Sequence, residues 1–256
     1  MSIARTVVYF AYLGDEGTDD DVVRRRLSFM ARQLQWLSDL IALSQQRIAV
    51  VVPYVAPRAW DGAVQDAVGA HDFRVDPASI AAERRNRFEY PGFLTLKRLA
   101  QQSPPDDLLF YCHSKGIVEL SDNKMGLFRL HTAVGLTADL HRLNSDPGRT
   151  RAGLFPSRYG WCWYNIFWIK AGHMADLPVE ESDDRYHFEA LIGGVRHKDG
   201  YRGVLPLIDR VPVEESGIAA KPWYHGGETT SPTLLASYDR YAAMTSPADA
   251  RRDGRG

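Results

Sequence analysis

The residues best suited to chemistry follow a short apolar run in the middle of the chain. Leu108–Cys112 is a continuous apolar stretch, typical of a strand covered on both faces, and His113, Ser114, Lys115 and Gly116 come directly after it. Lys115 could neutralise a phosphate, and His113 could donate to a phosphate oxygen or bind a metal when neutral. Gly116 permits a sharp turn. The alternative is an ordinary surface loop, because the spacing of a Walker loop is missing.

An aromatic segment, Trp161–Lys170, is the second candidate. Strand alternation would place one set of side chains on a common face: Trp163, Asn165, Phe167 and Ile169. Asn165 must find hydrogen-bond partners if it is buried there. An amide beside aromatic rings suits the stacking and orientation of a base or a sugar. The alternative is a core strand with one satisfied asparagine.

The third candidate is a carboxylate, Glu189, amid apolar residues on a predicted helix over 186–192. It could act as a general base in a ligand crevice, or it could pair with Arg185 one helical turn earlier. Arg129 and His225 are weaker candidates. An isolated helix arginine such as Arg129 is usually solvated, and His225 lies in a predicted turn that could close over a ligand or face the solvent.

The elements that must position these residues alternate between strand and helix. Apolar residues from Val23 to Ile41 recur every three or four positions, which predicts one helix with the acidic cap Asp19–Asp21. Pro91 opens another predicted helix. Further strands are expected in four segments: 6–13, 47–55, 71–75 and 163–169. Short helices are expected over 60–68 and 172–177, and a longer one over 124–143. This order predicts an α/β domain with a mostly parallel sheet, whose ligands lie beyond the carboxyl ends of the strands.

Composition limits the class of protein. The 256 residues include 31 basic and 32 acidic side chains, a net charge of −1, which does not favour nucleic acid as a partner. The sequence predicts one domain over 1–244 and a polar, disordered tail over 245–256. Two cysteines, no signal-peptide pattern and no long apolar run predict a cytoplasmic protein with reduced thiols and no integral membrane segment.

The order of the segments resembles a known family. The matching residues, in chain order, are Glu89-Tyr90-Pro91, Tyr111-x-His113-Ser114-Lys115-Gly116, Arg129, Asn165–Ile169, Arg185 and Glu189-x-x-Ile192-Gly193. They resemble bacterial glycosyltransferase-like proteins with a His-Thr-Lys-Gly segment and an Asn-Phe-Trp-Trp-Ala segment, related in style to the rhamnan-synthesis proteins of surface polysaccharide clusters. The resemblance runs from about Thr6 to Gly193.

The resemblance implies a single GT-A-like, Rossmann-like domain that moves a sugar from a nucleotide-sugar co-substrate to a glycan or other hydroxyl acceptor. It assigns the donor to His113, Ser114, Lys115, Arg129, Asn165 and Trp168. Glu189 would be the catalytic base, with Arg185 and His225 in support. The strand end carries His113-Ser114-Lys115 where such folds usually have a metal-binding Asp-x-Asp. That favours fixed cations at the leaving diphosphate, although a divalent metal stays open.

Departures from the family pattern favour a second hypothesis. Ser114 replaces the usual threonine, Phe128 stands where a tryptophan usually precedes Arg129, and the Asn165–Ile169 segment keeps only its asparagine and one tryptophan. The alternative function is therefore an inactive transferase-fold module that binds partners or glycans in a polysaccharide assembly system. A hydrolase of the Gly-x-Ser-x-Gly type is poorly supported, because that motif is missing.

Overall fold

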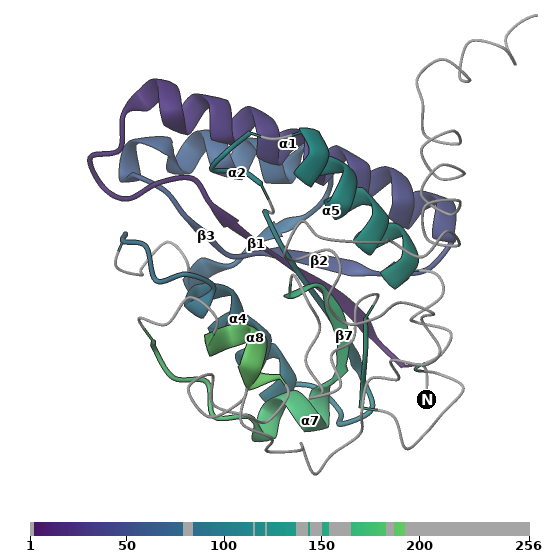
Figure 1. Cartoon of the computed structure of the whole chain (residues 1–256). Coiled ribbons are helices and arrows are strands. Elements are labelled where there is room, and N and C mark those ends of the chain that lie inside the picture. Colours follow the sequence, from purple (N-terminus) through teal and green to yellow (C-terminus); the bar gives the residue numbers. More distant parts are fainter. Residues whose placement is uncertain are drawn as a thin grey trace, which may run out of the picture.

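The computed structural model of the chain is an α/β structure with a seven-stranded mixed sheet between two layers of helices (Figure 1). It describes residues 3–78, 84–114, 116–120, 122–136, 143, 150–153, 165–182 and 187–192. The strands lie in the order β4-β2-β1-β5-β7-β6, and β3 pairs with β1. Their bounds are β1 Arg5–Tyr12, β2 Ala49–Val52, β3 Tyr54–Val55, β4 Arg74–Val75, β5 Leu108–His113, β6 Arg151–Ala152 and β7 Phe167–Lys170. The α/β prediction is confirmed.

One strand departs from the parallel arrangement. The strands from β4 to β5 are parallel, but β7 runs antiparallel to both β5 and β6. Tyr111 near the end of β5 therefore pairs with Phe167 at the start of β7. The reversal brings the amino end of β7 to the edge where β1 and β5 have their carboxyl ends. The sheet is thus mixed, with mostly parallel strands.

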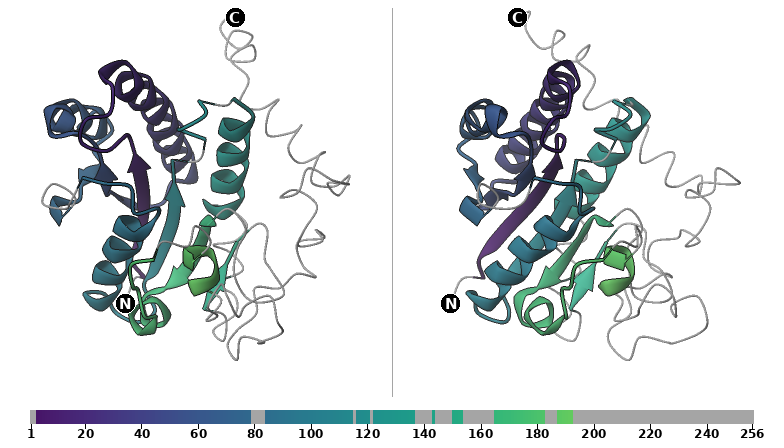
Figure 2. Two further views of the ribbon diagram at one scale, coloured as in Figure 1. Left: turned by 60° about the vertical axis from the view of Figure 1, so that its left-hand side comes forward. Right: turned by 90° about the vertical axis from the view of Figure 1, so that its left-hand side faces the viewer.

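The helices cover both faces of the sheet. Their bounds are α1 Asp20–Ser44, α2 Asp61–Gly69, α4 Tyr90–Gln101, α5 Asp122–Val134, α7 Ala171–Asp176 and α8 His187–Leu191, with a short 3-10 helix, η1, at Arg58–Trp60. Figures 1 and 2 show α1, α2 and α5 on one face and α4, α7 and α8 on the other. None of the helices in the described ranges is both long enough and apolar enough to cross a membrane.

Local sequence explains why these helices begin where they do. The Asp19 carboxylate accepts hydrogen bonds from the backbone N–H groups of Asp21 and Val22, as the predicted cap requires. The apolar face of α1 then packs on the sheet, and this predicted helix is confirmed. In α4, Pro91 lies in the first turn, where its missing N–H costs nothing.

Two predicted elements differ in extent. Asn165 lies just before β7 with φ +49°, not inside a strand, so the expected alternation from Trp163 does not extend through it. The helix predicted over 124–143 is α5, of which the structure describes a regular part ending at Val134. Trp163 and the predicted tail over 245–256 lie outside the described residues.

A glycine lets α4 approach the sheet closely. A Cβ atom on Gly92 would lie 2.7 Å from the Tyr111 hydroxyl oxygen and 2.8 Å from the Phe10 Cβ atom. Both distances are shorter than real side-chain contacts allow. Because Gly92 has no side chain, the first turn of α4 lies directly against β1 and β5, at the carboxyl ends of these strands.

Gly92→Ala is expected to lower the free energy of unfolding by about 1–3 kcal/mol, since the added methyl group overpacks this contact. Gly62→Ala is the matched control, because Gly62 also lies in a helix and a Cβ there meets nothing within 4 Å. The control should keep or raise stability, by up to about 1 kcal/mol. Urea unfolding of both variants measures the difference. Equal effects would show that the α4 contact is not tight.

Candidate functional site

The direction of the strand order reverses between β1 and β5, whose carboxyl ends lie at the same edge of the sheet. After β1 the chain passes through α1 to β2, toward the β4 end of the strand order, whereas after β5 it continues toward β7, in the other direction. Open α/β sheets bind ligands in the crevice at such a switch point. His113, the last residue of β5, lies at this edge, and its side chain is largely buried.

Glu89 is brought to the same edge by the turn before α4. Phe88 has φ +51° and its N–H bonds to the Asn86 side chain, so the chain reverses just before the helix. Glu89 is the N-cap residue, yet its carboxylate makes no capping bond. It lies instead with one oxygen 3.8 Å from His113 Nε2. When His113 is protonated, the two side chains form an ion pair.

Asn165 completes the contact from a third segment of the chain. Its side-chain Nδ2 donates a 2.9 Å hydrogen bond to the second carboxylate oxygen of Glu89. Asn165 is fully buried, and its Oδ1 atom has no hydrogen-bond partner among the residues that the structure describes. The prediction that a buried Asn165 must find partners is therefore confirmed for its Nδ2 atom, whose partner is Glu89.

Tyr111 lines the inner side of this cluster. Its ring stacks near that of His113, with 6.5 Å between centroids and 14° between planes. Burial, together with the negative charge of Glu89, raises the pKa of Tyr111 well above its ordinary value. Tyr111 is thus neutral at any ordinary pH, so Glu89 is the group among these four side chains that can carry the negative charge.

The helix that carries Glu189 packs beside the cluster. Phe188 of α8 contacts Phe93 and Tyr90 of α4, with centroid separations of 5.2 and 6.2 Å. Phe93 in turn contacts Tyr111 at 4.8 Å. The backbone of Glu189 is therefore at the same end of α4 as Glu89, as a shared site requires.

Three of the predicted ligand-binding residues have contacts within the fold. The Ser114 hydroxyl accepts a hydrogen bond from the Tyr12 N–H and ties β5 to β1. The Arg129 guanidinium lies over the Trp36 ring of α1, at 5.3 Å from its centroid, so the structure does not bring it to His113. Trp168 is fully buried, and its indole N–H donates to the Gly135 carbonyl at 2.6 Å.

The other predicted site residues fall outside the described part of the chain. These are Lys115, Arg185 and His225. The neighbours of Lys115 are described: Ser114 at the strand end and Gly116 with φ +80°. The turn that Gly116 was predicted to permit is therefore confirmed, and it follows β5 at the edge that carries His113.

Sequence reasoning gave no role to Glu89, although it joins two of the predicted residues. The sequence feature that could have identified Glu89 is its position at the start of a predicted helix. A helix N-cap is usually Ser, Thr, Asp or Asn, whose short side chains reach the free N–H groups. A glutamate before Tyr90 and Pro91 does not suit that position.

A second ion pair stabilises the loops at the same edge of the sheet. Arg84 donates two hydrogen bonds to the Asp61 carboxylate, at 2.7 and 2.8 Å, and Tyr54 donates a third. Burial acts to raise the pKa of Asp61, but the bonds from Arg84 and Tyr54 lower it overall. Burial and the bond to Asp61 raise the pKa of Tyr54 to about 12. The pair is thus ionised and the phenol neutral, and the three bonds link Arg84 and Tyr54 of β3 to the start of α2.

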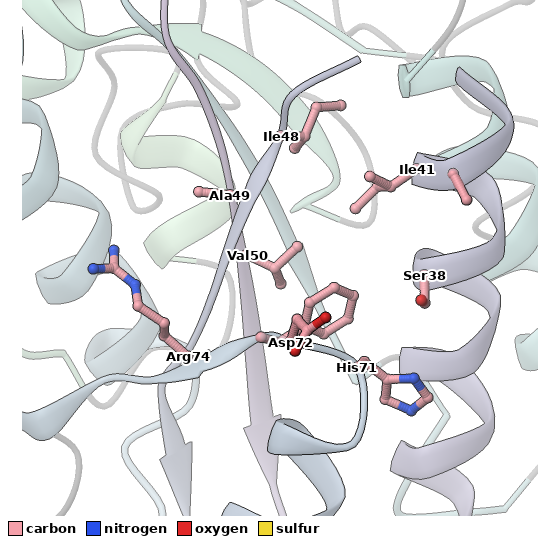
Figure 3. Close-up of a pocket in the computed structure, with 10 residues that line it drawn as sticks. Ser38, Ile41, Ile48, Ala49, Val50, His71, Asp72 and Arg74 are labelled. Atoms are coloured by element: carbon pink, nitrogen blue, oxygen red, sulfur yellow. The ribbon is translucent and has the colours of Figure 1, made fainter. Parts of the chain in front are cut away.

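A separate hollow of about 350 Å³ lies at the opposite end of the sheet (Figure 3). Ile41 of α1, Ile48 just before β2 and Val50 in β2 line it, with His71 and Phe73 from the chain before β4. These residues precede or begin parallel strands, so the hollow lies away from the carboxyl ends. It has no contact with the Glu89 cluster.

The chemistry available at the cluster is that of charge and hydrogen bonding. Glu89, His113 and Asn165 offer a carboxylate, an imidazole and an amide, a set that can orient a polar ligand. Among the described residues, no three His, Cys, Asp or Glu side chains are grouped as a metal site. Neither the models of known protein families nor the curated protein sequences gave a match to this chain.

Proposed function

We propose that this chain is a GT-A-like glycosyltransferase that moves a sugar from a nucleotide-sugar donor to a hydroxyl group of a glycan, in surface-polysaccharide biosynthesis. The observation that supports it is the contact of Glu89, His113 and Asn165 at the switch point of the sheet, with α8 packed beside them. Three distant segments of the chain bring polar side chains to the edge where α/β sheets bind ligands.

In the proposed reaction, the donor diphosphate lies over the ends of β1 and β5, beside His113 and Lys115. The bond between the anomeric carbon and the diphosphate oxygen breaks, and the acceptor oxygen bonds to that carbon. Glu189 takes the proton of the acceptor hydroxyl, and the nucleoside diphosphate leaves with the electron pair of the broken bond. Fixed donors and cations at the leaving oxygen stabilise this charge, each contributing about 3 kcal/mol.

Calorimetry and thermal unfolding against UDP, GDP, ADP, CDP and dTDP, each with and without manganese, test this proposal. One nucleoside diphosphate is expected to bind, and at a hundredfold excess over its Kd it should stabilise the folded protein by about 2.7 kcal/mol. The corresponding nucleotide-sugars should then support transfer of labelled sugar to a glycan acceptor.

The same binding measurements can also contradict the proposal. If no nucleotide stabilises the protein under either metal condition, the transferase proposal is wrong, and a binding module becomes the better explanation. If binding requires manganese, the fixed cations alone do not hold the diphosphate. Nucleotide binding without any sugar transfer would limit the chain to a binding role.

A further inference from the structure

Glu89 contacts two predicted ligand-binding side chains that come from different parts of the sheet. One carboxylate oxygen lies 3.8 Å from His113 Nε2 at the end of β5. The other accepts the 2.9 Å hydrogen bond from Asn165, just before β7. The amino end of β7 is at this edge because β7 is reversed, so the Glu89 carboxylate bridges the ends of two neighbouring antiparallel strands.

The start of α4 does not by itself explain a glutamate at this position. Glu89 makes no capping hydrogen bond, and a shorter residue would cap the helix better. Its side chain is only 17% exposed, and withdrawing a carboxylate from water is costly unless partners compensate for it. The nearby N-terminus of α4 favours its negative charge. The contacts to His113 and Asn165 offset part of this cost.

Asn165 adds a second, independent indication that this is a ligand site. Its φ of +49° lies in the left-handed region, which asparagine adopts more readily than most other residues. The side chain is fully buried, yet within the described part of the chain the Oδ1 atom lacks a hydrogen-bond partner. Buried polar atoms are normally hydrogen-bonded, so the free Oδ1 atom offers an acceptor to a ligand, while Glu89 holds the other end of the amide.

We propose that Glu89 is a positioning residue: its carboxylate fixes the His113 ring and the Asn165 amide in the orientation that receives the donor diphosphate. This inference rests on the proposed transferase function. Glu89 acts through His113 and Asn165 and does not itself take the acceptor proton. Its negative charge is the essential property, because a neutral side chain of the same length could still bond to Asn165 but would not attract the His113 ring.

Glu89→Gln is expected to weaken nucleoside diphosphate binding about ten- to hundredfold, the range for losing an interaction with a charged group. Glu89→Asp keeps the charge and should retain most of the affinity. Glu180→Gln is the matched control, since it removes one carboxylate from an exposed position between α7 and α8. Calorimetry with the nucleotide that binds best to the unaltered protein measures all three.

A double variant separates positioning from a general loss of structure. If Glu89 acts through His113, then Glu89→Gln should weaken binding further by no more than about twofold when His113→Gln is already present. A purely structural role would lower the affinity by the same factor in both backgrounds. It would also lower the affinity of Glu89→Asp together with its unfolding temperature.

The histidine ring signals of the ligand-free protein give a readout that does not depend on nucleotide binding. In NMR spectra, Glu89→Gln should shift or broaden the His113 ring signals, identified by their loss in His113→Gln, while Glu180→Gln leaves them unchanged. Unchanged His113 signals with full nucleotide affinity would overturn the positioning role and leave the transferase proposal standing. Altered signals in a protein that binds no nucleotide would instead overturn the transferase proposal.

Discussion

Replacing Trp168 with alanine is expected to lower the free energy of unfolding by about 3–5 kcal/mol, the usual cost of truncating a buried tryptophan. The indole is fully buried in β7 and packs on Phe110 with 5.0 Å between ring centroids. Its N–H donates to the Gly135 carbonyl just after α5. The variant would therefore leave a cavity and an unsatisfied carbonyl between β7 and α5. Urea unfolding at neutral pH measures the loss.

Trp168→Phe tests which part of the indole matters. Phenylalanine keeps an aromatic ring in the core but cannot donate to Gly135, so we expect a smaller loss, about 1–3 kcal/mol. Its affinity for nucleotide should match that of the unaltered protein. A fall in nucleotide affinity without a fall in stability would instead support the donor-binding role that the sequence pattern assigned to Trp168.

Glu189→Gln is expected to reduce the rate of sugar transfer about 10²- to 10⁴-fold, the range for removing a general base. Nucleotide affinity should stay unchanged, because the proposed role of this carboxylate is toward the acceptor hydroxyl. The packing of Phe188 on Tyr90 and Phe93 places the α8 backbone at the correct end of α4 for such a role. Initial rates with a confirmed donor and acceptor measure the effect.

Two further variants make that result specific. Glu180→Gln, which removes an exposed carboxylate nearby in the chain, should transfer sugar at the normal rate. Lys115→Ala should weaken nucleotide binding itself, since its proposed partner is the diphosphate. If Glu189→Gln and Lys115→Ala both retain full transfer on a confirmed substrate, the roles given to these residues are wrong.

The first half of the fold could be predicted because its signals are local. The apolar periodicity from Val23 to Ile41 and the acidic cap at Asp19 predict α1, and the run Leu108–Cys112 predicts β5. The reversal of β7 could not be predicted in the same way. An apolar segment such as Phe167–Lys170 has the same alternation in either direction, and only its partners decide the direction.

The candidate site could be predicted only in part, because some of its residues have local sequence signals and others do not. A polar run at the end of a buried strand identified His113, because strand ends in α/β sheets are where ligands bind. Glu89 lies in the matching segment Glu89-Tyr90-Pro91 but received no role, since its importance comes from contacts with residues far along the chain. Trp168 and Asn165 are near neighbours in sequence, but the turn before β7 gives them different surroundings: a dry core for the indole and the polar cluster for the amide.

The central position of β1 has a consequence for biosynthesis. β1 pairs with β5, for example through Val7 and Phe110. In chain order α1, β2, β4 and α4 come between these two strands, so β5 is made well after β1. Pairings between distant residues form slowly, and an unpaired apolar strand is prone to aggregate. We expect a nascent chain released before β5 to be captured by chaperones or degraded. The middle of the sheet therefore closes only after β5 has been made, and the edge that carries His113 forms with it.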